Sequence, residues 1–205
     1  MSKIPNLLNF FWKKPRIIII TSEGRKITAE AIYSILRGDF KIGKEVLIFE
    51  TDLKSSQELE RLKSLIKKSE SPILIATHTG EIPPDNISFA GDQNKLIEIR
   101  ELVKILPISG YLISNSDDEA VRELGKESQA KFLTFGFSER ADFIASDVKT
   151  NGGANFKINY RGNIVPVWLE KSNGKEQIYS ALAAAAVGII NGLNLVEISQ
   201  SLKKA

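Results

Sequence analysis

Short apolar runs alternate with amphipathic segments through the first two thirds of the chain. The runs are rich in β-branched or aromatic residues and end in polar turns, which predicts strands. The segments between them carry apolar residues three and four positions apart, which predicts helices. Strands that alternate with helices in this way indicate a parallel sheet covered by helices on both faces. The expected strands are 16–21, 45–50, 72–77, 110–115 and 131–136, and the expected helices are 26–38, 55–69, 93–106 and 117–128.

The pattern changes after about residue 140. Segments 141–152, 154–162 and 163–171 alternate apolar and polar residues, and a YRGN turn signal separates the last two, so we expect an antiparallel hairpin extension near residues 153–169. The alanine-rich segment 175–192 predicts a closely packed helix that stops at Asn191–Gly192. A short helix over 194–205 completes the prediction of a three-layer α/β/α fold.

Composition and charge narrow the function classes. The 205 residues are 42% apolar, enough to bury one core, and we expect a single domain. The formal charge of +3 is too small and too scattered to favour a nucleic-acid partner. The absence of cysteine excludes disulfides and thiolate metal sites, and the single histidine, His78, excludes a multi-histidine site. Without an apolar run that could cross a bilayer or a signal-peptide pattern, a cytoplasmic protein is expected.

Residues 1–13 are expected to form an N-terminal arm ahead of the domain at 14–205. The arm contains leucine, phenylalanine and tryptophan, followed by Lys13, Lys14 and Arg16. Such a segment suits contact with a membrane surface through residues 4–16. It equally suits packing on the domain, which is the simpler interpretation, or docking to a partner.

The stretch KPRIIIITSEGRKITAEAIYSIL, residues 14–36, has the outline of a phosphate-binding loop. A strand ends in a polar turn with Gly24 and a helix then begins. Backbone N–H groups at a helix N-terminus bind phosphate, and ligands of open α/β sheets bind at the carboxyl ends of the strands. A mainly parallel sheet of the P-loop type is therefore expected.

Six segments at these strand ends resemble, in order, the motifs of the Mur ligase family. TSEGRKIT resembles its T-G-S-x-G-K-T-T loop, VLIFE its second strand ending in glutamate, and THTGEIPPD its T-N-I-G-x-x-H turn. SNSDDEAV resembles V-L-N-x-D-D, FLTFG resembles T-F-G, and GKEQIYSALAAA resembles G-x-H-N-x-x-N-A-L-A-A. The resemblance covers about residues 14–204 and is strongest to the D-Ala-D-Ala-adding (UDP-N-acetylmuramoyl-tripeptide) branch.

The resemblance implies the central, ATP-binding domain of a ligase that joins amino acids or dipeptides to a cell-wall precursor through an acyl phosphate. It also implies ATP and Mg²⁺ as cofactors. We expect no counterpart of the N- and C-terminal domains of such ligases within these 205 residues, which leave no room for them. The segment that the family carries between its first helix and second strand is reduced here to GDFKIGKEVLIFE.

Several loop positions depart from the family pattern. With Thr21 aligned, Lys26 takes the place of the phosphate-loop lysine, while Ser22 and Arg25 replace glycines and Gly24 stands one place early. Glycine matters at these positions because side chains obstruct the approach of backbone N–H groups to phosphate. Lys26 with Arg25 could attract a phosphate, or both could be solvated charges at a helix start, which we favour.

The metal and adenine positions are altered as well. Ile27 stands where a hydroxyl should bind Mg²⁺, with Thr28 one position late. Glu50 stands at the place of a Mg²⁺-binding carboxylate, although an ion pair with Lys26 would explain a buried glutamate equally well. Further changes affect a metal-binding histidine, a carbamylated lysine, and a histidine with two asparagines on the final long helix. These become Pro83, Ile99, Glu176, Gln177 and Ser180.

Asn115, Asp117 and Asp118 are retained, although carboxylates at a helix start also cap it. His78 replaces the asparagine of the third turn and is expected to be a hydrogen-bonded turn residue. The residues of the vestigial ATP site are therefore Thr21, Ser22, Gly24, Arg25, Lys26, Thr28, Asn115 and Gln177, with Glu50 as a weak metal ligand.

The leading hypothesis is a degenerate, non-catalytic domain with a scaffold or binding role, a protein partner or self-association, and no bound cofactor. One alternative is an ATP-dependent ligase fragment completed by partner chains. Another is a nucleotide sensor that binds ATP without turnover through Lys26, Glu50 and Arg25. Mg²⁺-dependent ATP turnover would separate the ligase from the other two.

Overall fold

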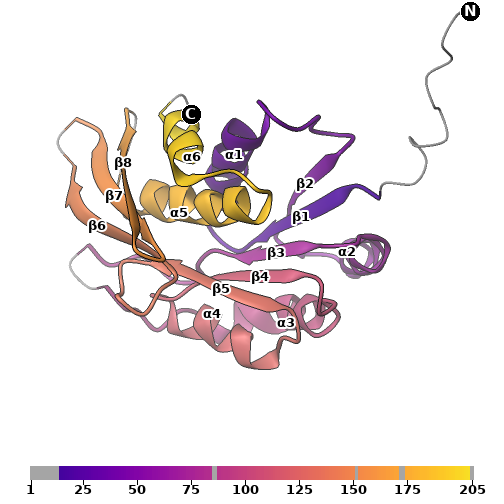
Figure 1. Ribbon diagram of the computed structural model, residues 1–205. Helices are drawn as coiled ribbons and strands as arrows, with labels where there is room; N and C mark the ends of the chain where they lie inside the picture. Colours follow the sequence, from indigo (N-terminus) through magenta and orange to yellow (C-terminus); the bar gives the residue numbers. More distant parts are fainter. Residues whose placement is uncertain (1–13, 85–86, 151, 171–173, 204–205) are drawn as a thin grey trace, which may run out of the picture.

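The structure is a computed structural model that describes residues 14–84, 87–150, 152–170 and 174–203 (Figure 1). The predicted N-terminal arm, residues 1–13, lies outside the described residues. No helix in the described ranges is both long and apolar enough to cross a bilayer. The strands are β1 (Arg16–Thr21), β2 (Val46–Glu50), β3 (Ile73–Ala76), β4 (Tyr111–Asn115), β5 (Lys131–Gly136), β6 (Phe143–Lys149), β7 (Ala154–Tyr160) and β8 (Asn163–Leu169). The helices are α1 (Arg25–Leu36), α2 (Ser56–Lys68), α3 (Ile97–Lys104), α4 (Glu119–Glu123), α5 (Lys175–Ile190) and α6 (Leu195–Leu202), with short 3₁₀ helices η2 (Gln93–Leu96) and η3 (Leu124–Glu127).

The strands form one sheet in the order β2-β1-β3-β4-β5-β6-β7-β8. Pairing is parallel from β2 through to β6 and antiparallel between β6, β7 and β8. The predicted hairpin extension is therefore confirmed, with β7 and β8 joined across Arg161–Gly162. β1 lies between β2 and β3, so the chain first adds β2 on one side of β1 and then adds β3 on the other side. Open α/β sheets bind ligands at such a point, where the strand order reverses.

Helices cover both faces of the sheet, as the three-layer prediction requires (Figure 1). Helices α1, α5 and α6 pack on one face, and α2, α3 and α4 pack on the other. The run of isoleucines in β1 serves both layers, because Ile18 and Ile20 contact the first group while Ile17 and Ile19 contact the second. This two-sided burial explains why β1 is apolar throughout instead of alternating.

The alanine-rich helix α5 is buried as predicted. Its residues 181–186 are at most 1% exposed, and α5 packs against α1 and the centre of the sheet. Alanine side chains allow a close helix approach, and this contact brings the start of α5 next to the start of α1. That proximity places the residues of the candidate site.

Candidate functional site

The loop between β1 and α1 keeps the backbone shape of a glycine-rich turn. Ser22 has a φ of 76° and Gly24 a φ of 70°, both in the left-handed region. Glycine adopts this region freely, whereas a serine is strained there. Helix α1 starts at Arg25 without a side-chain hydrogen bond to its first N–H groups. The strand-to-helix turn that the sequence predicts over residues 21–28 is present.

The turn after β3 closes over this loop. The Glu23 N–H donates to the His78 carbonyl at 2.9 Å. The Thr77 hydroxyl lies 3.0 Å from the Thr21 carbonyl and also contacts the carbonyl of Glu23. The Thr21 hydroxyl in turn donates to the Ile75 carbonyl at 3.0 Å. One N–H group of the loop, that of Glu23, is thus bonded to the protein itself.

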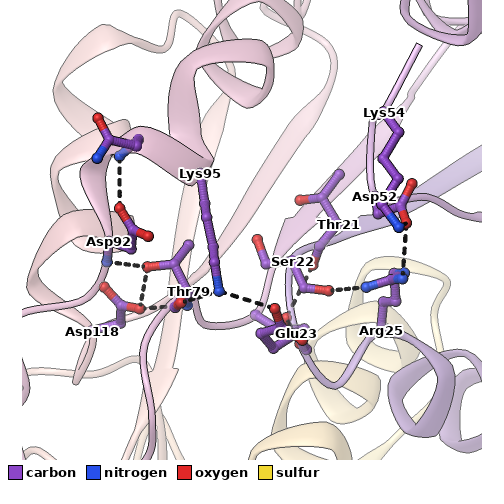
Figure 2. Close-up of polar contacts among 12 residues, drawn as sticks. Thr21, Ser22, Glu23, Arg25, Asp52, Lys54, Thr79, Asp92, Lys95 and Asp118 are labelled. Atoms are coloured by element: carbon purple, nitrogen blue, oxygen red, sulfur yellow. Dashed lines mark hydrogen bonds and ion pairs between the residues drawn. The ribbon is translucent and has the colours of Figure 1, made fainter.

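Arg25 folds back across the loop (Figure 2). Its guanidinium donates to the Ser22 carbonyl at 3.0 Å and forms an ion pair with Asp52 at 3.4 Å. Lys54 contacts the same carboxylate at 2.8 Å, and its hydrogen bond, followed by the charges of Lys54 and Arg25, holds the pKa of Asp52 below the ordinary value despite partial desolvation. Figure 2 also shows Lys95 reaching Glu23, at 3.1 Å. Arg25 is therefore bonded to the loop and to Asp52 and is not a freely solvated charge at the helix start.

Two side chains close the space beside Gly24. A methyl group added to Gly24 would lie 3.1 Å from Glu176 Oε1 and 3.1 Å from His78 Cε1. His78 is 5% exposed, and burial lowers its pKa more than the nearby carboxylates of Asp118 and Glu23 raise it. A buried imidazole and an acidic side chain therefore lie beside Gly24.

Thr28, one candidate for the Mg²⁺-binding hydroxyl, is hydrogen-bonded within the protein. Its Oγ1 lies 3.0 Å from the Gly24 carbonyl and 3.0 Å from Ser180 Oγ on α5, and both side chains are buried. The structure thus joins two positions of the predicted ATP site, but as a helix-to-helix hydrogen bond. A buried hydroxyl with both partners in place contributes to stability instead of binding a cation.

The Lys26–Glu50 ion pair, one of the two explanations considered for Glu50, is absent from the described residues, and the expectation that Glu50 is buried was wrong. Both side chains are exposed and line the same groove. The prediction assumed that Glu50 ends a buried strand, but β2 is at the edge of the sheet. An exposed carboxylate does not require a partner. Within the described ranges no three His, Cys, Asp or Glu side chains are grouped to hold a metal ion.

The retained acidic residues have structural roles. Asp118 caps α4 through the Val121 N–H at 3.0 Å and accepts from the Thr79 N–H at 2.7 Å. Asp117 accepts from the Phe137 N–H at 2.6 Å and from the Tyr179 hydroxyl at 3.0 Å. Burial raises the pKa of Asp117, although these hydrogen bonds act in the opposite direction.

Sequence reasoning missed Asp52, Thr77 and Tyr179 as members of this region. Thr77 directly follows β3 and Asp52 lies two residues after the end of β2, which is a signal that could have identified them. Tyr179 lies among alanines and apolar residues of α5, and its contact with Asp117 has no local sequence signal.

Buried polar atoms without a hydrogen-bond partner gather near the strand ends. They belong to the loop, the β3 turn, the end of β4 and the start of α5. Such atoms are uncommon in folded proteins and call for an explanation. The predicted site residues Ser22, Asn115 and Gln177 are thus brought to one region of the fold. The atoms are Ser22 Oγ, His78 Nδ1, Asn115 Nδ2 and Gln177 Oε1, with Ser114 Oγ deeper in β4.

Comparison with known proteins identifies relatives of this fold and sequence. The Mur ligase middle domain model matches residues 28–188, a range that begins after the loop at 21–27. UDP-N-acetylmuramate–L-alanine ligase of Alkaliphilus metalliredigens is 22% identical over 199 residues, which is 92% of this chain and 43% of that protein.

Solved structures show the same fold. MurF from Acinetobacter baumannii has a TM-score of 0.73 and 20% identity, and the match covers 93% of this chain and 45% of that protein. MurF ligase from Thermotoga maritima in complex with ADP has a TM-score of 0.69 and 16% identity, and the match covers 91% of this chain and 48% of that protein. This chain thus spans less than half the length of these relatives. The resemblance predicted from the six motifs is confirmed.

Proposed function

Because the chain belongs to the Mur ligase family through its middle domain, we propose that it is a non-catalytic member with a binding or scaffold role linked to peptidoglycan synthesis. Its protein partner is a cell-wall ligase or a second copy of the chain. A cytoplasmic location, expected from the sequence, is part of this proposal.

The observation that carries the proposal is the closed phosphate loop. The carboxylate of Glu176 lies beside Gly24, and the β3 turn accepts the N–H of Glu23. A phosphate at this place would meet a negative side chain and would compete with hydrogen bonds already made within the protein. Both effects weaken binding of a nucleotide triphosphate.

The residues around the loop also fit Mg²⁺ poorly. Mg²⁺ needs hard oxygen ligands in octahedral array. The hydroxyl of Thr28 is engaged with Ser180, and Ile27, Pro83 and Ile99 carry no side-chain oxygen. Glu50 is left as one exposed carboxylate, which is too little for a metal-assisted phosphoryl transfer. Loss of a single charge-stabilising group typically lowers a rate by ~10²–10³, so we expect no ligation.

ATP titration of the purified chain, with and without Mg²⁺, is the first test, with phosphate release measured on the same samples. We expect no Mg²⁺-dependent hydrolysis. A full-length Mur ligase serves as the positive control, and Lys26→Ala as the matched variant. Hydrolysis that Lys26→Ala abolishes would overturn the proposal and restore the ligase hypothesis.

One observation favours a second candidate function, the nucleotide sensor. The start of α1 has no side-chain cap, so its first N–H groups remain available to an anion. ATP binding without turnover, lost in Lys26→Ala and strengthened in Glu176→Gln, would support the sensor. If the native chain does not bind ATP and Glu176→Gln does, the carboxylate of Glu176 closes the loop.

A further inference from the structure

The free edge of the sheet at β2 faces a groove. β2 is the outermost strand, and a groove of about 790 Å³ runs between it and α1. Residues 47–50 all line this groove. Side chains of a strand alternate between its two faces, so consecutive residues line one groove only where the backbone edge faces it. The groove therefore exposes the unpaired backbone of β2.

The hydrogen bonds identify which backbone groups are free. The Arg16 N–H donates to the Glu45 carbonyl at 2.9 Å and the Thr51 N–H to the Ile20 carbonyl at 3.0 Å. The odd-numbered residues of β2 therefore pair with β1, and the even-numbered residues direct their N–H and C=O groups outward. The Gly43 N–H donates to the outward carbonyl of Val46 at 2.8 Å. In the described part of the chain no partner reaches the outward groups of Ile48 and Glu50.

The opposite wall of the groove is formed by α1. Ala29 and Tyr33 line it, and Tyr33 is 48% exposed although it is aromatic. Ile42, together with Leu47 and Phe49, adds further apolar surface. The charged side chains of Lys26, Glu30, Arg37 and Glu50 also line the groove, so its apolar surface lies between charged groups. Apolar surface beside an unpaired strand edge is an arrangement that binds an extended peptide by strand addition. Exposed apolar edges of this kind also promote aggregation, so native proteins normally cover them.

We propose that the chain's own N-terminal segment, residues 4–12 (IPNLLNFFW), covers this edge as an added strand. The segment has no charged residue and contains two leucines, two phenylalanines and Trp12. Its side chains on one face would contact Tyr33 and Ala29, and its backbone would pair with Ile48 and Glu50. This occupant matches both features of the groove, the apolar wall and the unpaired backbone.

Position and length allow this contact. The described chain begins at Lys14, and Arg16 pairs with Val46 at the start of β2. The described chain therefore begins close to the start of β2. At ~3.3 Å per residue, residues 4–12 extend over about 30 Å, whereas β2 extends over about 17 Å. A tethered segment has an effective concentration in the millimolar range, which favours it over the same segment of a second copy.

Amide hydrogen exchange, measured residue by residue on the full chain, tests the strand pairing. The amides of Ile48 and Glu50 should exchange at least about tenfold more slowly in the native chain than in a Phe10→Asp, Phe11→Asp double variant. The amide of Thr51, already bonded to β1, should be unchanged, as should the β8 amides at the far edge. Asn9→Asp adds a charge without removing an apolar side chain and is the milder control. Equal exchange at Ile48 and Glu50 in native chain and double variant would overturn the proposal.

Tryptophan emission tests the groove wall independently. Trp168 is 51% exposed on β8, at the opposite edge, so Trp168→Phe leaves Trp12 as the single reporter. Tyr33→Asp should shift the emission of Trp12 to the red, whereas Ser64→Asp on the exposed surface of α2 should leave it unchanged. If Trp12 emits like a solvent-exposed indole and Tyr33→Asp does not alter that emission, the contact is refuted.

The remaining occupants give distinct results that also overturn the proposal. If the segment of a second copy fills the groove, protection of Ile48 and Glu50 will fall on dilution and sedimentation will show a dimer. If the segment binds a membrane instead, the emission of Trp12 will shift only when anionic vesicles are added, and Ile48 will remain unprotected. The proposal requires protection that is independent of concentration and of vesicles.

Discussion

Replacing Ser22 by glycine should stabilise the protein, although glycine usually destabilises. Ser22 has a φ of 76°, in the region that side chains disfavour, and its buried Oγ has no hydrogen-bond partner. Glycine removes both problems at once. This is the position at which the family pattern has a glycine, so the variant also tests whether the loop backbone has kept its ancestral shape.

The magnitude follows from three contributions. Relief of the left-handed conformation is worth ~1–2 kcal/mol, and removal of an unsatisfied buried hydroxyl ~1–3 kcal/mol. Glycine costs ~0.5–1 kcal/mol in backbone entropy. Because Ser22 as a whole is only partly buried, the lower values apply, and we expect a gain of about 1–2 kcal/mol. At ~2–4 °C per kcal/mol for a domain of this size, the melting temperature should rise by about 2–8 °C.

Thermal and urea denaturation of Ser22→Gly and Ser22→Ala separate the two favourable contributions. Ser22→Ala removes the hydroxyl but keeps the strained backbone, so it should gain less than Ser22→Gly. A glycine variant that is less stable than the native chain, or no more stable than Ser22→Ala, would refute the reasoning. In that case the hydroxyl or the conformation would have a compensating partner that the contacts do not show.

Three further predictions concern the surroundings of the site. Gly91→Ala should lower the free energy of unfolding by about 3 kcal/mol or more, measured by thermal denaturation, because its φ is +71° and its Cβ would lie 2.0 Å from Asp118 Oδ1. Gly162→Ala, with a φ of +78° and open space around the added Cβ, should lower it by only ~1–2 kcal/mol. Burial raises the pKa of Asp117 above 3.8, so the folded state holds this proton more tightly than the unfolded state does. The free energy of unfolding should therefore fall as the pH rises through the pKa of the folded state. Urea denaturation across pH should show no such decrease in Asp117→Asn, and parallel profiles of the variant and the native chain would contradict this. Ala184→Leu should destabilise by ~1–3 kcal/mol in urea because α5 leaves no space there, and an unchanged midpoint would disprove that packing.

The sequence predicted the fold well because the relevant signals are local. The β1 run, the heptad-like spacing of α2 and the alternation of β7 each identify their own element, and the observed bounds of β1 and β5 match the expected ones. Turn residues such as Gly162 marked the hairpin correctly. Hydrophobic burial on one or two faces imposes these periods, and no knowledge of distant partners is needed to read them.

The site was less predictable because its contacts join distant segments. Glu176 lies beside Gly24, and Thr28 bonds to Ser180, across most of the length of the chain. The error at Glu50 has the same origin, since local sequence indicates a strand but not its place in the sheet. Whether a carboxylate at a strand end is buried depends on strand order, which periodicity does not determine.

The loop has a backbone shape suited to glycine although position 22 is a serine, and the contacts explain how this is possible. Ser22 keeps a conformation suited to glycine because Thr77 and His78 hold the carbonyl and N–H groups on either side of it. These restraints come from β3 and do not depend on a bound phosphate. A side chain from another element, such as Glu176 of α5, can therefore lie beside the loop without altering the loop backbone or the sheet.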